Sequence, residues 1–293
     1  MNESEVLSVV DRIHANFFDR KFLTTLELDP KAIYLDLISI HNEELIYTAS
    51  IESFIAGVFL ACEYNYPFDV NWDSQFLNKV RRVCIKLRHK IHAEEELHNS
   101  QERQNADSLS NYINKIIYHH SKVLVVRVDL FYPKNIQERI NINVFHEDMK
   151  CFLECIANKR GFLKGSLGYA WALEQGYSKG YHCHLLFLFN GSKHCRDIHF
   201  GYKIGELWIH ITKNRGAYFN CNTDEYKNKY ENSGILGIGM INRNSKVEVE
   251  NLFSTANYLT IQKFEQRLKV HIPGMRTFGH GIYKTSGRRR INR

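Results

Sequence analysis

Two strand-like stretches joined by a short turn constrain the fold of this chain more than any other feature. The first, 166-SLGYAWALEQ-175, and the second, 181-YHCHLLFLF-189, are rich in apolar and aromatic residues and have the length of complete strands. Three residues lie between Gly176 and Gly180, and this is the length of a tight hairpin loop. The sequence therefore predicts an antiparallel hairpin at the centre of the C-terminal half.

Helical and strand patterns alternate around this hairpin. The β-branched run 122-KVLVVRVDLFYP-133 ends at a proline and predicts a strand. Asn143 can cap an amphipathic helix after it, and Gly161 can end that helix. Further elements are expected as helices at about 196–213 and 247–266 and as a strand at about 235–242. This order, β-α-β-β-α-β-α, predicts an antiparallel sheet with helices packed on it.

The first part of the chain has apolar residues at helical spacing instead. The first helical face consists of Val6, Val9, Val10, Ile13 and Phe17. Asn2 and Glu5 can cap this helix. The segment 93–111 has few apolar residues, so it is an exposed helix or a linker, and it marks the best domain boundary. We therefore expect an α+β protein with an all-helical N-terminal region, residues 1–118, and a sheet domain, residues 119–293.

Positive charge is concentrated at the C-terminal end. The whole chain has a formal net charge of +7, and residues 264–293 reach the same value alone, with eight Lys or Arg and one Glu. A basic end on a neutral body favours a polyanion partner, nucleic acid first. The residues expected to bind DNA are Arg276, Lys284, Arg288, Arg289 and Arg290. The alternative is a solvated tail with no partner.

Several features predict a cytoplasmic protein that does not associate with membranes. Glu3 and Glu5 lie near the N-terminus, where a secretory signal would carry basic residues before an apolar run. The apolar run 54-FIAGVFLAC-62 is much shorter than the roughly 20 residues that a spanning helix needs. The seven cysteines form no CxxC pair, which is typical of reduced thiols.

Two histidines, His182 and His184, open the second strand of the hairpin. Because side chains alternate along a strand, both project from one face, about 7 Å apart. A three-residue turn puts Glu174 directly across from His182. Two imidazoles and a carboxylate suit a divalent metal that keeps open positions for a substrate. The alternative is a set of polar residues that only satisfy one another on the sheet.

Several stretches together resemble a known family. The histidine pair resembles that of HUH endonucleases, and residues 121–283 resemble the gene II-type replication initiators of filamentous phages (inoviruses). The resemblance is carried by 124-LVVRVDLFYP-133, 171-WALEQGYSKGYHCHLLFLF-189, 237-GIGMINRN-244, 258-YLT-260 and 276-RTFGHG-281. It implies a ferredoxin-like HUH palm, Mg²⁺ or Mn²⁺ bound by His182, His184 and Glu174, and a tyrosine that cuts DNA.

Tyr258 is the expected nucleophile. On a helix over 247–266, at 100° per residue, it lies roughly 180° from Val249 and so on the polar face. The resemblance matches Tyr258 to the tyrosine that opens a YLTK-like stretch, but position 261 is Ile. Lys263 is the nearest lysine, and we expect it to take the lysine's role only if the helix ends early or unwinds. The alternative for Tyr258 is an exposed tyrosine without a role.

The resemblance implies nicking and joining of single-stranded DNA, by metal-assisted transesterification at Tyr258, in rolling-circle replication of a phage, prophage or plasmid-like element. The expected partner is single-stranded DNA at a replication origin, with a host replication helicase as a second candidate. One alternative is a DNA-binding replication regulator with weak or no catalysis, which Ile261 favours. Another is a metal-dependent phosphodiesterase that uses water. Asp129 is a candidate base or a structural residue.

Overall fold

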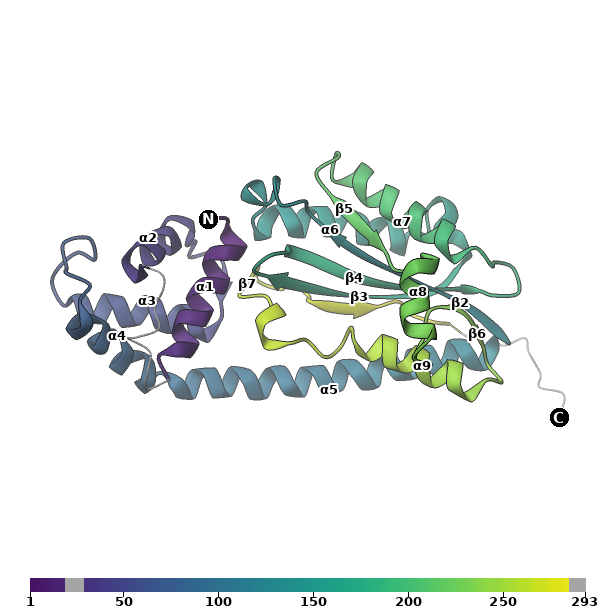
Figure 1. The fold of residues 1–293 in the computed structure, drawn as a ribbon, viewed down its shortest axis with the longest axis horizontal. Coiled ribbons are helices and arrows are strands. Elements are labelled where there is room, and N and C mark those ends of the chain that lie inside the picture. The colour runs from purple at the N-terminus through teal and green to yellow at the C-terminus, as the bar shows by residue number, and fades with distance from the viewer. Residues whose placement is uncertain (19–28, 285–293) are drawn as a thin grey trace.

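A computed structural model describes residues 1–18 and 29–284, and within them a six-stranded antiparallel sheet forms the centre of the C-terminal half (Figure 1). Its strands are β2 (Lys122–Phe131), β3 (Ser166–Gly176), β4 (Gly180–Asn190), β5 (Ala217–Asn220), β6 (Gly239–Asn242) and β8 (Phe278–His280). The strand order is β5-β2-β4-β3-β8, and β6 pairs with the other end of β2. The expected α+β class, with helices ahead of an antiparallel sheet, is confirmed.

The predicted hairpin is the pair β3 and β4. Its register places Glu174 opposite His182, and the strand ends meet at Gly176 and Gly180. On the other side of β4, strand β2 pairs so that Asp129 lies opposite His184. Three neighbouring strands therefore bring polar side chains together near one end of the sheet.

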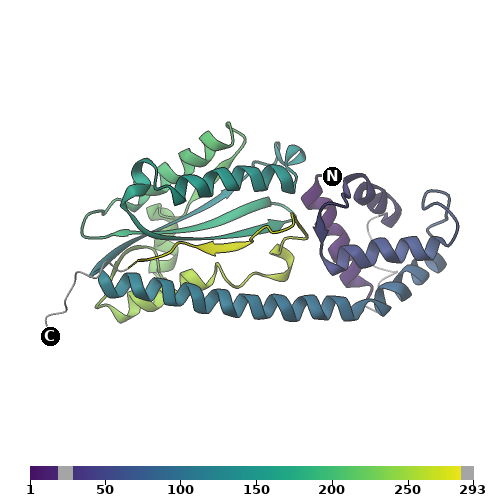
Figure 2. The ribbon, with the colours of Figure 1, turned by 180° about the vertical axis from the view of Figure 1, so that it is seen from behind.

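Helices cover both faces of the sheet (Figures 1 and 2). One face packs against α6 (Ile142–Ala157) and α7 (Asp197–Ile211), and the other against α5 (Arg88–His119) and α9 (Lys246–Asn257). The short helix α8 (Asp224–Glu231) follows β5. Alternation along the strands builds a separate core on each face, because odd-numbered residues of β4 such as Leu185 join the first core and even-numbered residues such as Leu186 join the second.

The N-terminal region is helical, as predicted, apart from one very short strand. It contains α1 (Glu3–Asn16), α2 (Pro30–Ile40), α3 (Ala49–Cys62), α4 (Ser74–Lys86) and the strand β1 (Ile46–Tyr47). Asn2 and Glu5 form the expected capping box at the start of α1. Strand β1 pairs with β7 (Val270–His271), so this region is tied to the C-terminal part of the chain by backbone hydrogen bonds. Among the described residues, no helix has both the length and the apolar character to cross a membrane.

The segment 93–111 is part of one continuous helix, α5, rather than a linker. The second half of this helix lies under the sheet, where Leu109, Ile113 and Ile116 are fully buried in the same core as Leu186. These residues share the sheet's core, although the sequence analysis assigns them to the N-terminal region. A domain boundary at residue 118 stays a prediction.

Several element ends differ from the expected ones. Helix α6 is capped by Asn141 rather than Asn143, because the Asn141 side chain accepts a hydrogen bond from the backbone N–H of Val144. It ends at Ala157, before Gly161. Helix α9 ends at Asn257, well before residue 266, and a single 3₁₀ turn (Phe264–Gln266) follows later. Two further 3₁₀ turns are Gln137–Arg139 and Gly161–Gly165.

Candidate metal centre and adjoining groove

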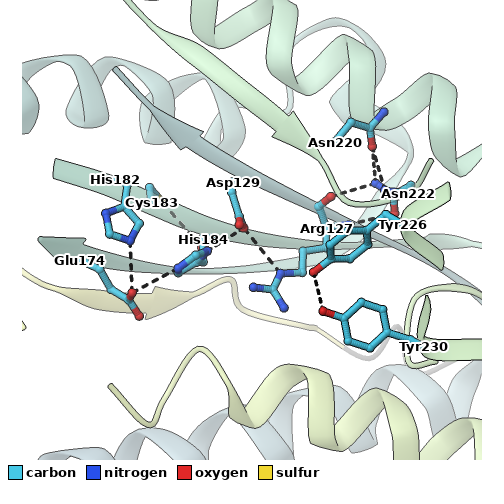
Figure 3. A network of polar contacts seen from close by, with 10 residues as sticks. All are labelled: Arg127, Asp129, Glu174, His182, Cys183, His184, Asn220, Asn222, Tyr226 and Tyr230. Carbon is cyan, nitrogen blue, oxygen red and sulfur yellow. Dashed lines mark hydrogen bonds and ion pairs between the residues drawn. The ribbon is translucent and has the colours of Figure 1, made fainter. Parts of the chain in front are cut away.

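His182, His184 and Glu174 converge on the face of the sheet that α5 and α9 cover. All three side chains are almost completely buried. One carboxylate oxygen, Oε2 of Glu174, lies 3.3 Å from Nε2 of His182 and 3.2 Å from Nε2 of His184. One potential ligand atom from each residue lies within 4.8 Å of the other two. The structure thus brings together the three residues predicted to bind a metal (Figure 3).

The other ring nitrogen of each histidine is held by the protein. Nδ1 of His182 donates to the carbonyl of Gly180 at 3.0 Å, and Nδ1 of His184 donates to Oδ1 of Asp129 at 2.6 Å. Both Nε2 atoms therefore point toward Glu174. A histidine that donates through one nitrogen and presents the other is the usual arrangement of a metal ligand. Among the described residues, the buried Nε2 of His182 has the 3.3 Å contact with Glu174 but no hydrogen bond of good geometry, and a bound cation would provide a partner.

The electrostatics of the three residues also fit a cation. Burial raises the pKa of Glu174, but the two histidines outweigh it and lower that pKa to about 2, so the group is a carboxylate. Burial lowers the pKa of His184, yet the charges of Asp129 and Glu174 raise it to about 9. The proton on His184 is thus shared with acidic neighbours, and a metal would replace it.

Tyr258 lies beside this group at the end of α9. It is the C-cap residue that directly follows the helix, and it is 40% exposed. The centroid of its ring is 5.5 Å from that of His184, and the two rings meet edge to face. Burial raises the pKa of Tyr258, the charge of Glu174 adds to the rise, and Arg127 opposes it. The predicted nucleophile and the predicted metal ligands are therefore neighbours.

Lys263, by contrast, is not part of this cluster. The early end of α9 removes it from the helix, and it lies exposed at the start of the 3₁₀ turn after it. Within residues 1–18 and 29–284 it forms no hydrogen bond or ion pair with the triad or Tyr258. Ile261 is 63% exposed. Neither position 261 nor Lys263 therefore provides Tyr258 with the lysine that the YLTK-like pattern would supply.

Arg127 is a functional candidate that the sequence analysis did not identify. It lies on β2 two residues before Asp129, so both side chains share the face of His184. The guanidinium carbon is 4.7 Å from the centroid of the Tyr258 ring, and Nε is 3.6 Å from Oδ1 of Asp129. The pattern Arg-x-Asp on the strand predicted at 122–133, which also carries the candidate base Asp129, is the signal that could have revealed it.

A groove of about 730 Å³ opens beside Tyr258 and His184. Two basic residues, Arg127 and Lys179, line it. Its aromatic lining consists of Phe131, Phe219, Tyr226, Tyr230 and Tyr258. The hydroxyls of Tyr226 and Tyr230 lie 3.0 Å apart, and the ring of Phe219 packs edge to face on that of Tyr226. The triad therefore borders a groove that combines aromatic surface with positive charge.

The structure describes only some of the residues that the sequence predicts to bind DNA. Arg276 and Lys284 are exposed. Arg288, Arg289 and Arg290 lie outside the described residues. The role of this basic end therefore stays a prediction from charge.

These features define a class of protein: an α+β domain with a candidate metal site of two histidines and a glutamate on an antiparallel sheet, and a tyrosine beside it. The sequence model of the YagK/YfjJ C-terminal domain matches residues 87–281, about two thirds of the chain. The chain belongs to this family. The match begins at the start of α5 and includes the triad, Arg127 and Tyr258. No curated protein and no solved structure matches the chain.

Proposed function

We propose that this protein nicks and rejoins single-stranded DNA through a covalent intermediate on Tyr258. The observation that carries the proposal is the position of the Tyr258 ring, 5.5 Å from His184, at the border between a buried histidine–glutamate group and an open groove. A tyrosine that only packs would not need a candidate metal site next to its ring. The resemblance to gene II-type replication initiators supports the same chemistry.

The candidate metal centre has a defined part in this chemistry. His182, His184 and Glu174 would hold Mg²⁺ or Mn²⁺, which when bound polarises a phosphate oxygen and offsets the charge of the transition state. Asp129 keeps the ring of His184 in the orientation that presents Nε2. His184 is the residue of the triad that lines the groove, so a phosphate would approach the triad from that side.

The reaction is a transesterification that needs no second substrate. The phenol oxygen of Tyr258 attacks phosphorus, a new P–O bond forms, and the bond between phosphorus and the 3′ oxygen breaks. The phenol gives up its proton to solvent or a nearby base, and the leaving 3′ oxygen takes one up. The products are a 5′-phosphotyrosine and a free 3′-hydroxyl. The reverse reaction with a 3′-hydroxyl rejoins the strand and restores Tyr258.

The groove suits an unpaired strand. Stacking on aromatic rings is available only to bases that are free of a partner strand, and Phe219 and Tyr230 are 46% and 37% exposed. Arg127 and Lys179 add positive charge for the phosphates. We therefore infer that the bound DNA is single-stranded where it crosses the site.

The proposed biological role is initiation of rolling-circle replication of a phage, prophage or plasmid-like element. The free 3′-hydroxyl would prime synthesis, and the later joining step would release a closed single strand. Origin DNA is then the main partner, and a host replication helicase, which would unwind the duplex ahead of synthesis, is a second one. The basic C-terminal residues would add affinity for the phosphates.

A second candidate function is a replication regulator that binds DNA on the same fold with little or no catalysis. The specific observation in its favour is that the stretch after Tyr258 offers it no lysine, since position 261 is an exposed isoleucine and Lys263 forms no hydrogen bond or ion pair with the cluster within the described residues. Metal-dependent hydrolysis by water is a third reaction that the same triad could support. The three functions differ in what happens to the DNA: a covalent adduct forms, the strand is hydrolysed, or the strand is bound without cleavage.

A covalent-adduct assay separates them. The full chain is incubated with Mn²⁺ and a pool of 3′-labelled single-stranded oligonucleotides with randomised sequence. The proposal predicts a labelled protein band that withstands denaturation and is lost in Tyr258→Phe. Tyr64→Phe, at a fully exposed tyrosine of the N-terminal region, serves as the matched control and should behave like the native chain. Cleavage without an adduct would favour hydrolysis, and binding without cleavage would favour the regulator.

A further inference from the structure

We propose that Arg127 contacts the phosphate attacked by Tyr258 and supplies the positive charge that position 261 does not. The proposal rests on the function proposed above and adds a residue to the same site. The starting observation is that a cation in contact with the Tyr258 ring, Arg127, comes from strand β2 and not from the stretch that follows the tyrosine.

The position of Arg127 is set by the sheet. In the pairing of β2 with β4, Arg127 lies opposite Leu186 and Asp129 lies opposite His184, so the guanidinium is one strand away from the metal ligands on the same face. Its carbon lies 4.7 Å from the centroid of the Tyr258 ring. A phosphate placed between Tyr258 and His184 would therefore lie within reach of this side chain.

The hydrogen-bonding capacity of Arg127 is only partly used. A guanidinium has five N–H donors, and the buried Nε atom of Arg127 has no hydrogen-bond partner within residues 1–18 and 29–284. Its nearest acid, Asp129, is 3.6 Å away and accepts a much closer hydrogen bond of 2.6 Å from His184. Figure 3 shows the terminal nitrogens of Arg127 turned away from Asp129. An anion in the groove would complete the set of partners.

The side chain of Asn222 holds the backbone of Arg127 through two hydrogen bonds. The side chain of Asn222 accepts from the N–H of Arg127 at 3.2 Å and donates to its carbonyl at 2.8 Å. Asn222 is fully buried and bonded in turn to Asn220. The base of the side chain is therefore fixed before any substrate binds, as electrostatic stabilisation of a transition state requires.

The guanidinium also matches the expected ligand in shape. A planar fork of N–H groups pairs with two oxygens of one phosphate, while its face packs on an aromatic ring. The guanidinium carbon of Arg127 already lies over the ring of Tyr258, and only 13% of the side chain is exposed. Low exposure strengthens its interaction with an anion, because little water competes.

A structural role is the main competing explanation. Arg127 could serve only to hold Asp129 and to support the ring of Tyr258. In that case its charge would not act on DNA, and removing the charge while keeping the stem would leave the salt dependence of DNA binding unchanged. The two roles can therefore be separated by binding measurements that need no catalysis.

The binding experiment uses the full chain, EDTA and a short single-stranded oligo-dT. Loss of one phosphate contact lowers the slope of log affinity against log salt by about 0.7. We expect this change in Arg127→Gln and a native slope in Arg127→Lys. Arg103→Gln, at an exposed arginine of α5, is the matched control and should keep the native slope. If Arg127→Gln does not fold, Arg127→Met removes the charge but keeps the stem.

The kinetic experiment measures the rate of adduct formation at saturating DNA with Mn²⁺. Loss of one preorganised donor to a transition state costs about 10²- to 10³-fold in rate, so Arg127→Gln should slow adduct formation to that extent, with partial recovery in Arg127→Lys. A native salt slope in the charge-free variants would overturn the proposal even if their rates fall. Should the native chain form no adduct, the proposed function fails, and the salt slope alone decides whether Arg127 contacts phosphate.

Discussion

Asp129 connects the two functional parts of the site, because the same oxygen approaches His184 at 2.6 Å and Arg127 at 3.6 Å. Burial raises the pKa of Asp129, but His184 and Arg127 lower it to about 2, so it stays charged. A charged acceptor behind a histidine fixes the ring and increases its basicity as a ligand. In the proposed site, Asp129 would thus act through His184, as a positioning residue.

The first prediction concerns this residue. Asp129→Asn keeps the size of the side chain and removes its charge, and we expect Mn²⁺ affinity to fall about 10- to 100-fold. Titration calorimetry or the electron paramagnetic resonance of free Mn²⁺ measures the change. Asp224→Asn, at an exposed acid that pairs loosely with Lys227, is the control. Equal affinity in both variants would show that Asp129 does not support a metal ligand.

The second prediction concerns pH and a buried histidine away from the site. Burial lowers the pKa of His14 to about 4, and its Nε2 has no hydrogen-bond partner in the part of the chain that the structure describes. A depressed pKa means that the neutral form stabilises the fold above pH 6.5, and that this contribution is lost as the pH falls toward 4. The difference corresponds to about 3 kcal/mol in the free energy of unfolding.

Urea unfolding at pH 7 and pH 4.5 tests it. His14→Leu removes the titrating group, so its free energy of unfolding should fall less on acidification than that of the native chain. His89→Leu, at an exposed histidine, should show the native pH dependence. If acidification lowers the free energy of unfolding of His14→Leu as much as that of the native chain, the pH dependence does not come from His14.

At the scale of elements, the hairpin is the part of the candidate site that the sequence predicts best. A turn of known length and a side-chain period of two determine that Glu174 faces His182, so local rules suffice for the triad. Arg127 and Asp129 join it only through the pairing of β2 with β4, which depends on strand order. Spacing along the chain contains no information on that order.

The end of α9 shows a different limit. The apolar spacing continues past Asn257, but the helix ends at that residue and Tyr258 is its C-cap. The following segment is held by partners far away in sequence: the N–H of Gln262 donates to Glu102 of α5, and its side chain donates to the carbonyl of Leu173 on β3. Tertiary hydrogen bonds thus replaced helical ones, which periodicity alone does not predict.

The third prediction concerns α5 as an element of the sheet's core. Ile113 is fully buried between this helix and the sheet, whereas Leu97, earlier in the same helix, is 71% exposed. Ile113→Ala should lower the free energy of unfolding by about 2–5 kcal/mol, and Leu97→Ala should change it by less than about 0.5 kcal/mol. Urea denaturation of both variants measures this. Similar losses at both positions would mean that α5 does not pack as described.

At the scale of the whole molecule, the N-terminal region is attached to the segment that follows the tyrosine. Strand β1 pairs with β7, and the N–H of Lys269, just before β7, donates to Gln175 of β3 at 2.8 Å. The backbone of β1 and the side chain of Gln175 therefore both hold the chain between Tyr258 and the last strand. The N-terminal region thus contacts the segment that leads from Tyr258 to β8.

The fourth prediction concerns the basic end of the chain. Deleting residues 284–293 removes five Lys or Arg, and single-stranded DNA binding should weaken and depend less on salt. The rate of adduct formation at saturating DNA should stay native, because the deletion leaves the triad and Tyr258 in place. Filter binding over a salt series gives the slope. An unchanged slope would favour a solvated tail without a partner.

The most direct test of the central claim is to identify the atom that carries DNA. The adduct formed with Mn²⁺ is digested with nuclease and protease, and the peptides are analysed by mass spectrometry. The account predicts a nucleotide remnant on the peptide that contains Tyr258, linked through phosphate to the phenol oxygen. A remnant on Tyr230 or Tyr283 instead, or an adduct that persists in Tyr258→Phe, would contradict it.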